Sequence, residues 1–151
     1  MQVQFANPEE ITQIAALCGK SFKENEYDKL GIEPSVEKTL TELAEAVAGG
    51  VVLVHRNPSN PKKLDGVLAL AFSESWFSSH VYLAGLVFYI NPEVRSYKLA
   101  KSFLETAKEY AIMNDVPIVF DSFGRKDAEQ KKKLLKRLGF KDYGLGLIFV
   151  P

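Results

Sequence analysis

The chain has 151 residues, a formal net charge of zero and a hydrophobic content of 46%. This length suggests one domain, which would bury roughly 70% of the surface that the unfolded chain exposes. A net charge of zero argues against nucleic-acid binding driven by the charge of the whole protein, although a local basic patch is not excluded. With a single cysteine, Cys18, the chain has no intramolecular disulfide. We predict one globular domain over residues 1–151.

Nothing in the sequence points to a membrane or to export. The N-terminus, MQVQFANPEE, lacks the basic region and apolar run of a signal peptide, and no apolar stretch is long enough to cross a bilayer. We therefore expect a cytoplasmic protein. Cys18 lies on the apolar face of an expected helix, so buried packing is the favoured interpretation of this residue and a catalytic thiol a remote one.

The first third of the chain predicts one strand and two helices. The expected elements are a strand at 2–6, a helix from Asn7 to Phe22, a polar loop at 23–34 and a helix from Ser35 to about Val47. Asn7 and Ser35 are residue types that cap helix N-termini, and Gly49-Gly50 is a typical stop signal. An apolar stripe at helical spacing supports the second helix and consists of Val36, Leu40, Leu43 and Val47.

The rest of the chain predicts five strands and two helices. The expected strands are 51–55, 64–72, 80–90, 116–121 and 143–150, and the expected helices follow Arg95–Ala100 and span 127–138. Turn-forming residues at 56–63 join the first two of these strands into a hairpin. The order predicts an α/β (α+β mixed) fold, in which one mixed six-stranded sheet is covered by helices on both faces.

Residues 88–111, FYINPEVRSYKLAKSFLETAKEYA, are the most informative stretch of the chain. A strand ends at Tyr89-Ile90, a turn follows at Asn91-Pro92, and Arg95–Ala100 leads into an amphipathic helix. Such a strand–loop–helix directs several unpaired backbone N–H groups and the positive end of the helix dipole at one spot. We therefore predict an anion site there, suited to a phosphate or pyrophosphate.

Residues 95–100 resemble the acetyl-CoA-binding motif of the GNAT N-acetyltransferases, R/Q-x-x-G-x-G/A, with Arg95 in its first position and Ala100 in its last. Two further segments carry the resemblance nearly end to end. Residues 133–140, KLLKRLGF, resemble the late helix of that family and its Leu-Gly-Phe turn. The run LALAFSESWFSSHVYLAGLVFYINPEVR resembles a compact GNAT subgroup often met in phages and prophages.

The resemblance implies a GNAT-like domain in which strands four and five splay apart, with acetyl-CoA as co-substrate and no metal. The exposed edge of strand four would bind the pantetheine as an added strand does, and backbone N–H groups would hold the pyrophosphate. The implied cofactor-binding residues are Phe88, Tyr89, Ile90, Arg95, Ser96, Tyr97, Lys98, Leu99, Ala100 and Asp127, the last of which aligns with an asparagine of the subgroup.

Three departures from the family pattern bear on function. Lys98 stands where the middle glycine is expected, and its ammonium either attracts the phosphates or points to water. Leu135 stands where many members carry a tyrosine that protonates the departing thiolate of CoA. The predicted sheet stops after six strands, whereas family members usually have seven.

Acetyl transfer from a thioester requires a neutral amine, an oxyanion donor and a proton for the thiolate. A lysine-like amine with a pKa near 10.4 lies ~3.4 units from deprotonation at pH 7, or roughly 4.6 kcal/mol, so a base helps. Glu74 and His80 are candidate bases, although a solvated carboxylate and a strand-edge histidine are the competing interpretations. Tyr97 is a candidate acid, as are Tyr143 and Ser122, each with a structural role as the alternative. The family uses the backbone N–H near Ile90 as oxyanion donor.

We therefore predict an N-acetyltransferase that moves an acetyl group from acetyl-CoA to a primary amine. The acceptor would be a protein lysine, a protein N-terminus, a polyamine or another small amine. The alternative is a catalytically weak GNAT-fold module that binds CoA, a partner protein or both. The positions of Trp76 and Phe77 discriminate between the enzyme and the binding module. A binding module would present them as an exposed apolar patch rather than as a pocket wall. A homodimer formed through exposed sheet edges is plausible.

Overall fold

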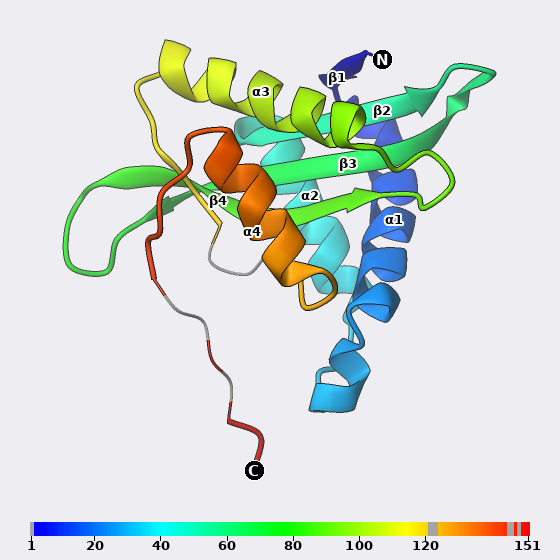
Figure 1. The fold of residues 1–151 in the computed structure, drawn as a ribbon. Coiled ribbons are helices and arrows are strands. Elements are labelled where there is room, and N and C mark those ends of the chain that lie inside the picture. Colours follow the sequence, from blue (N-terminus) through cyan, green and yellow to red (C-terminus); the bar gives the residue numbers. More distant parts are fainter. Residues whose placement is uncertain (1, 121–123, 145–146, 148) are drawn as a thin grey trace.

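The computed structural model describes residues 2–120, 124–144, 147 and 149–151. Figure 1 shows the order of its helices and strands. The strands are β1 (Val3–Phe5), β2 (Val51–Asn57), β3 (Asn60–Glu74), β4 (Val81–Ile90) and β5 (Ile118–Val119). The α-helices are α1 (Ile11–Glu24), α2 (Val36–Gly49), α3 (Tyr97–Met113) and α4 (Ala128–Arg137), and the 3₁₀ helices are η1 (Pro8–Glu10) and η2 (Tyr27–Leu30). None of the described helices is both long and apolar enough to span a membrane.

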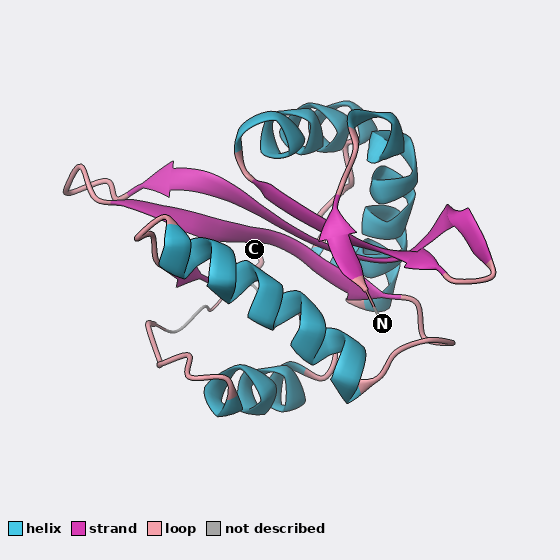
Figure 2. Cartoon of the chain, turned by 90° about the horizontal axis from the view of Figure 1, so that it is seen from above, coloured by secondary structure: helices cyan, strands magenta, loops and turns pink. Residues whose placement is uncertain are grey.

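The strands form one sheet in the order β1-β2-β3-β4-β5, antiparallel except for the parallel pair β4–β5. Figure 2 shows helices on both faces of this sheet. One buried core joins α1 and α2 to one face, and the other joins α3 and the end of α4 to the opposite face. Ile14 and Leu43 belong to the first core, and Phe103 and Leu138 to the second. The expected mixed sheet covered on both faces is confirmed.

Local capping explains where the helices begin. The Ser35 hydroxyl accepts a hydrogen bond from the Lys38 N–H at 3.2 Å and starts α2 as predicted. The Asn7 N–H donates to the Glu10 carboxylate at 2.8 Å, which fixes the turn before α1. At α3 the cap is Ser96, whose hydroxyl accepts from the Leu99 N–H at 3.2 Å. The N-terminus of α3 is therefore set by its own sequence.

The prediction of a sixth strand at 143–150 is wrong for the described residues, and the sheet has five strands. Those of its residues that the structure describes lie outside any strand, and Leu147 and Phe149 are 86% and 88% exposed. The other residues of that segment lie outside the described part of the chain. Alternating apolar residues suit a pleated surface, but a strand also requires a neighbouring strand to pair with.

Several element boundaries also differ from the prediction. The hairpin is longer than expected, because β2 continues to Asn57 and β3 begins at Asn60. The strand expected at 116–121 is Ile118–Val119, and Asp121 lies outside the described residues. Val36 is 71% exposed rather than part of the apolar stripe, because it is the first residue of its helix.

Candidate active site

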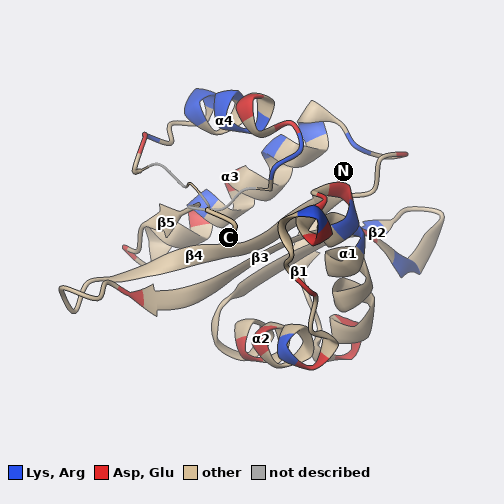
Figure 3. Cartoon of the chain, turned by 90° about the horizontal axis from the view of Figure 1, so that it is seen from below, with Lys and Arg blue, Asp and Glu red and all other residues tan. Residues whose placement is uncertain are grey.

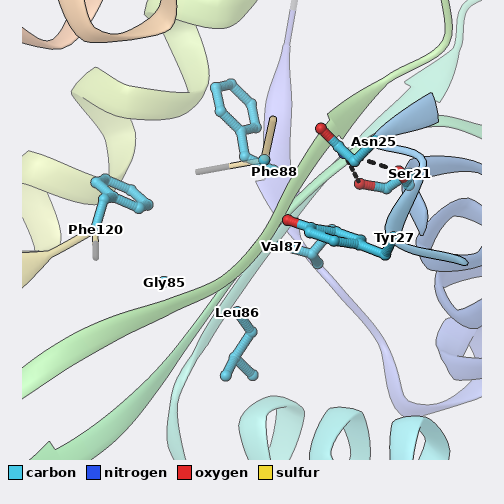
Figure 4. Close-up of a pocket in the computed structure, with 9 residues that line it drawn as sticks. Ser21, Asn25, Tyr27, Gly85, Leu86, Val87, Phe88 and Phe120 are labelled. Atoms are coloured by element: carbon cyan, nitrogen blue, oxygen red, sulfur yellow. Dashed lines mark hydrogen bonds between the residues drawn. The ribbon is translucent and has the colours of Figure 1, made fainter. Parts of the chain in front are cut away.

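A cleft opens beside β4, between the C-terminal end of α1 and the residue that follows β5 (Figure 4). Its volume is about 110 Å³. Among the described residues its lining consists of Ser21, Asn25, Tyr27, Gly85, Leu86, Val87, Phe88, Phe120 and Gly124. Pockets that enclose a whole drug-sized ligand are roughly 300–1,000 Å³, so this cleft suits the narrow end of a ligand that extends beyond it.

The cleft lies where β4 and β5 stop pairing. β5 pairs with β4 only at Leu83 and Ala84, and the register with β3 shifts just beyond them, around Leu86. Such a bulge bends a strand and redirects its edge. Gly85 is required here, because a Cβ atom at this position would lie 2.3 Å from Cδ1 of Phe120. The wall formed by Phe120 can therefore approach β4 only at a glycine.

The opposite wall is held by the side chain of Asn25, which is only 6% exposed. Its amide nitrogen donates to the Ser21 carbonyl at 2.8 Å, and its oxygen accepts from the Lys126 N–H at 3.0 Å. Gly124 has a φ of +78° and leaves no room for a Cβ, which would lie 2.5 Å from that same oxygen. Residues 124–126 are thus attached to the end of α1 across the cleft.

The N-terminus of α3 is the predicted anion site. The N–H groups of Tyr97 and Lys98 belong to the first helical turn, which has no intrahelical acceptors. The helix runs for 17 residues, so its dipole adds positive potential at the same point. Lys98 is exposed and is not among the described non-glycine residues with positive φ, so replacing the motif glycine costs no backbone strain. Lysine at this position therefore leaves the first-turn N–H groups in place, and anion binding by them stays a prediction.

The Arg95 side chain closes the loop between β4 and α3. Its guanidinium donates to the Ile90 carbonyl at 3.1 and 2.8 Å and to both Glu24 carboxylate oxygens at 2.8 Å. It also lies over the Tyr89 ring, with 5.7 Å between the guanidinium carbon and the ring centroid. Arg95 therefore positions the loop and connects it to α1, while the backbone beyond it faces the anion site.

A buried polar network supports the start of the same loop. The Asp65 carboxylate is 2% exposed and accepts hydrogen bonds from Asn57 at 2.6 Å and from Asn91 at 3.2 Å. The Asn91 N–H donates to the Asp65 carbonyl at 2.8 Å, and the Lys20 ammonium donates to the Asn91 side chain at 3.2 Å. Both ends of the loop are thus held before any ligand binds, which lowers the entropy lost on binding.

Charges from three elements meet at this loop. The hydrogen bonds from Arg95 lower the pKa of Glu24, and the same contact raises the pKa of Arg95. Burial lowers the pKa of Lys131, and the negative charges of Glu24 and Asp127 act in the opposite direction. Figure 3 shows lysine and arginine residues gathered on α4, the helix that carries Lys131. The site thus joins α1, the β4–α3 loop and α4 in one electrostatic cluster.

Comparison with known proteins gives structural matches only. No protein-family model matches the sequence, and no curated protein matches it. A probable acetyltransferase of known structure superposes with a TM-score of 0.71 at 19% identity, covering 100% of this chain and 97% of the other. A predicted acetyltransferase from Clostridium acetobutylicum, solved with acetyl-CoA, gives 0.74 at 14% identity, covering 98% and 94%. An aminoglycoside acetyltransferase from an uncultured soil sample gives 0.67 at 14% identity, covering 98% and 96%.

The chain has a GNAT-type acetyltransferase fold. The fold expected from the resemblance is therefore confirmed, and membership of the phage-type subgroup stays a prediction.

The structure brings most of the predicted cofactor residues of this fold to one edge. Phe88 lines the cleft, and Tyr89 and Ile90 follow it along β4. Arg95 to Ala100 lie at the N-terminus of α3, and Asp127 stands at the start of α4, close enough for its charge to act on Arg95. Tyr89, Ile90 and Leu99 are buried, whereas Tyr97 and Lys98 are exposed. The role of all these residues in binding acetyl-CoA stays a prediction.

The predicted catalytic residues are more scattered. Glu74 pairs with Val81 at the turn end of the β3–β4 hairpin, and His80 directly precedes β4. At ~3.3 Å per residue, the four residues from Val81 to Gly85 separate Glu74 from the cleft by about 13 Å. Tyr97 is 54% exposed at the first position of α3, beside the anion site rather than in the cleft.

Other groups discussed for proton transfer are not brought to the cleft either. Tyr143 is 73% exposed, and Ser122 lies outside the described residues. Leu135 packs partly buried against the core, and its carbonyl accepts from the Phe140 N–H. Trp76 and Phe77 are 94% and 69% exposed and meet edge to face at 5.4 Å. They are therefore exposed to solvent and do not line the cleft.

Sequence reasoning missed the residues that α1 and its following turn supply. Glu24, Asn25 and Tyr27 lie in a segment predicted only as a polar loop. The partners of Glu24 and Asn25 at the cleft, Arg95 and Lys126, are 71 and 101 residues away in sequence. No local pattern identifies such pairs. Gly85 carried a usable signal, because an isolated glycine inside a strand pattern indicates a bulge or a close approach.

Proposed function

We propose that the protein is an N-acetyltransferase that transfers an acetyl group from acetyl-CoA to a primary amine. The observation that carries this proposal is that β4 runs on from the cleft at Gly85, beyond its pairing with β5, to the loop before the first-turn N–H groups of Tyr97 and Lys98. An acyl thioester with a long pantetheine arm and a pyrophosphate matches that arrangement. The arm pairs with the edge of β4, and the pyrophosphate binds at the helix N-terminus.

The fold and one named neighbour support this choice of donor. The neighbour from Clostridium acetobutylicum is described with acetyl-CoA, and several others are named acetyltransferases. In this chain a backbone N–H on the edge of β4 polarises the thioester carbonyl, which makes its carbon open to attack by a neutral amine. Among the described residues no three His, Cys, Asp or Glu side chains come together as metal ligands would.

Calorimetric titration with acetyl-CoA, followed by thiol release in the presence of amines, tests the proposal. The panel comprises spermidine, poly-L-lysine, a peptide with a free N-terminus and an aminoglycoside. We expect micromolar binding of acetyl-CoA and thiol release with at least one amine class. A protein that binds neither acetyl-CoA nor CoA would refute the proposal.

The second candidate function is a GNAT-fold module that binds a partner protein and turns over slowly. The observation that favours it is the exposed Trp76–Phe77 pair at the end of the β3–β4 hairpin, because adjacent exposed aromatic residues are typical of interaction sites. This candidate predicts CoA binding without thiol release across the whole amine panel. Replacing both aromatics by serine would then abolish partner binding, while acetyl-CoA affinity stays the same.

A further inference from the structure

Acetyl transfer in this cleft requires a group that handles two protons. The thiolate of CoA takes up one proton as it leaves, and the attacking nitrogen loses one as the amide forms. The usual tyrosine is replaced by Leu135, and Glu74 and His80 lie at the far end of the hairpin. The source and the acceptor of these protons must therefore be sought among the residues at the cleft itself.

Tyr27 is the one titratable side chain among the described residues that line the cleft. The other linings are apolar residues, glycines, Ser21 and Asn25. The Asn25 amide donates to the Ser21 hydroxyl at 3.4 Å and to the Ser21 carbonyl at 2.8 Å. Figure 4 shows the Tyr27 side chain crossing above Val87 with its hydroxyl directed toward β4. A phenol hydroxyl both donates and accepts, which a proton shuttle requires.

The position of Tyr27 is fixed by its surroundings. Its ring packs against Phe22, with centroids 5.6 Å apart, and its carbonyl accepts from the Ile32 N–H at 3.2 Å. The preceding residue, Glu26, has a φ of +52°, a left-handed conformation that costs a non-glycine residue energy. This turn reverses the chain at the end of α1 and brings the phenol into the cleft.

We propose that Tyr27 is the proton shuttle of the transfer reaction, an inference that rests on the proposed function. The amine nitrogen attacks the thioester carbon, and the C–N bond forms as the carbonyl electrons move to oxygen. The carbonyl then re-forms and the C–S bond breaks, with its electron pair leaving on sulfur. Tyr27 gives its phenolic proton to that sulfur and recovers a proton from the positively charged nitrogen. The products are an amide, free CoA thiol and the original phenol.

The substitution Tyr27→Phe tests this role, because it keeps the ring against Phe22 and removes only the hydroxyl. We expect kcat for thiol release to fall about 100-fold, in the range of general acid–base catalysis, with the Kd for acetyl-CoA within twofold of the wild type. Tyr110→Phe is the matched control, since Tyr110 is also half-buried and also packs against a phenylalanine, on a different part of the molecule. It should leave both quantities unchanged.

The outcomes separate this inference from the proposed function. Failure of the wild type to bind acetyl-CoA overturns the proposed function. Turnover that survives Tyr27→Phe overturns the shuttle alone. If the wild type binds acetyl-CoA but none of the panel amines reacts, the role of Tyr27 is tested by fluorine NMR of protein labelled with 3-fluorotyrosine. The resonance absent from Tyr27→Phe should then shift with acetyl-CoA and differ from its position with free CoA, and an unmoved resonance overturns the inference.

Discussion

Removing the negative charge of Glu24 should loosen the loop that carries the anion site. In the native protein this carboxylate holds Arg95 through two hydrogen bonds of 2.8 Å, and the two side chains are 14% and 36% exposed. Exposed ion pairs contribute about 0.2–1 kcal/mol, and hydrogen bonds to charged groups about 1.5–3 kcal/mol. For this partly exposed bidentate pair we expect Glu24→Gln to lower the free energy of unfolding by about 1–2 kcal/mol.

Urea denaturation as a function of pH measures this contribution. Arg95 lowers the pKa of Glu24 below its unfolded value of about 4.3, so the pair stabilises the folded protein above that value. The stabilisation is lost as the pH falls through the lowered pKa. The difference between wild type and Glu24→Gln should therefore be full at pH 7 and should shrink below about pH 4. A difference that persists at pH 2 would contradict this account.

The ion pair of Glu10 with Arg56 supplies a matched control. It has the same bidentate geometry, with two contacts of 2.8 Å, and its side chains are 14% and 20% exposed, but it joins η1 to β2 away from the cleft. Glu10→Gln should cost a similar amount of stability and leave the Kd for acetyl-CoA unchanged. Glu24→Gln should weaken acetyl-CoA binding about 3- to 10-fold, because binding must then order the loop. Equal effects of both variants on the Kd would refute a specific role for Arg95 and Glu24 at the anion site.

Four further predictions follow from single positions. Burial raises the pKa of the Cys18 thiol to about 11, so a thiol reagent at pH 8 should modify the native protein about 100-fold more slowly than the unfolded chain. Asp65→Ala should cost about 2–4 kcal/mol in urea denaturation, because it leaves the buried amide of Asn91 without its partner. Gly85→Ala should lower the melting temperature by several degrees and weaken acetyl-CoA binding, since the new methyl group displaces the cleft wall. Lys98→Ala should raise the Kd for acetyl-CoA a few-fold at low salt and less at high salt, and an unchanged Kd at both would mean that the ammonium only points to water.

The parts of the fold that local chemistry determines could be predicted from the sequence. Ser35 caps its helix as predicted, because its hydroxyl oxygen reaches the N–H group three residues on. Ser96, which we did not predict as a cap, makes the same local contact. The long apolar strand before Asn91 is also local, because its residues are apolar on both faces. The sixth strand failed for the opposite reason, since alternation in 143–150 does not say which strand would pair with it.

The sequence predicted the part of the candidate site that backbone groups form, but not the part that side chains form. The candidate anion site, which stays a prediction, follows from a strand, a turn and a helix that are consecutive in sequence. The cleft instead needs Tyr27 from one segment, Gly85 from another and Phe120 from a third. These residues meet because a bulge in β4 and a left-handed turn at Glu26 redirect the chain. The isolated Gly85 hints at the bulge, but the turn at Glu26 has no pattern of its own in the sequence. The side chains that line the cleft are therefore identified from the tertiary structure.

The difference between backbone and side-chain contributions also explains why the motif tolerates Lys98. A motif glycine is indispensable where its dihedral angles or a close approach exclude a side chain. Lys98 lies in the first turn of α3 without a positive φ, and its side chain is exposed. The N–H groups that the motif supplies are therefore present with lysine as they would be with glycine. A close approach does exclude a side chain at Gly85, twelve residues before the helix begins, where the wall of the cleft meets the strand.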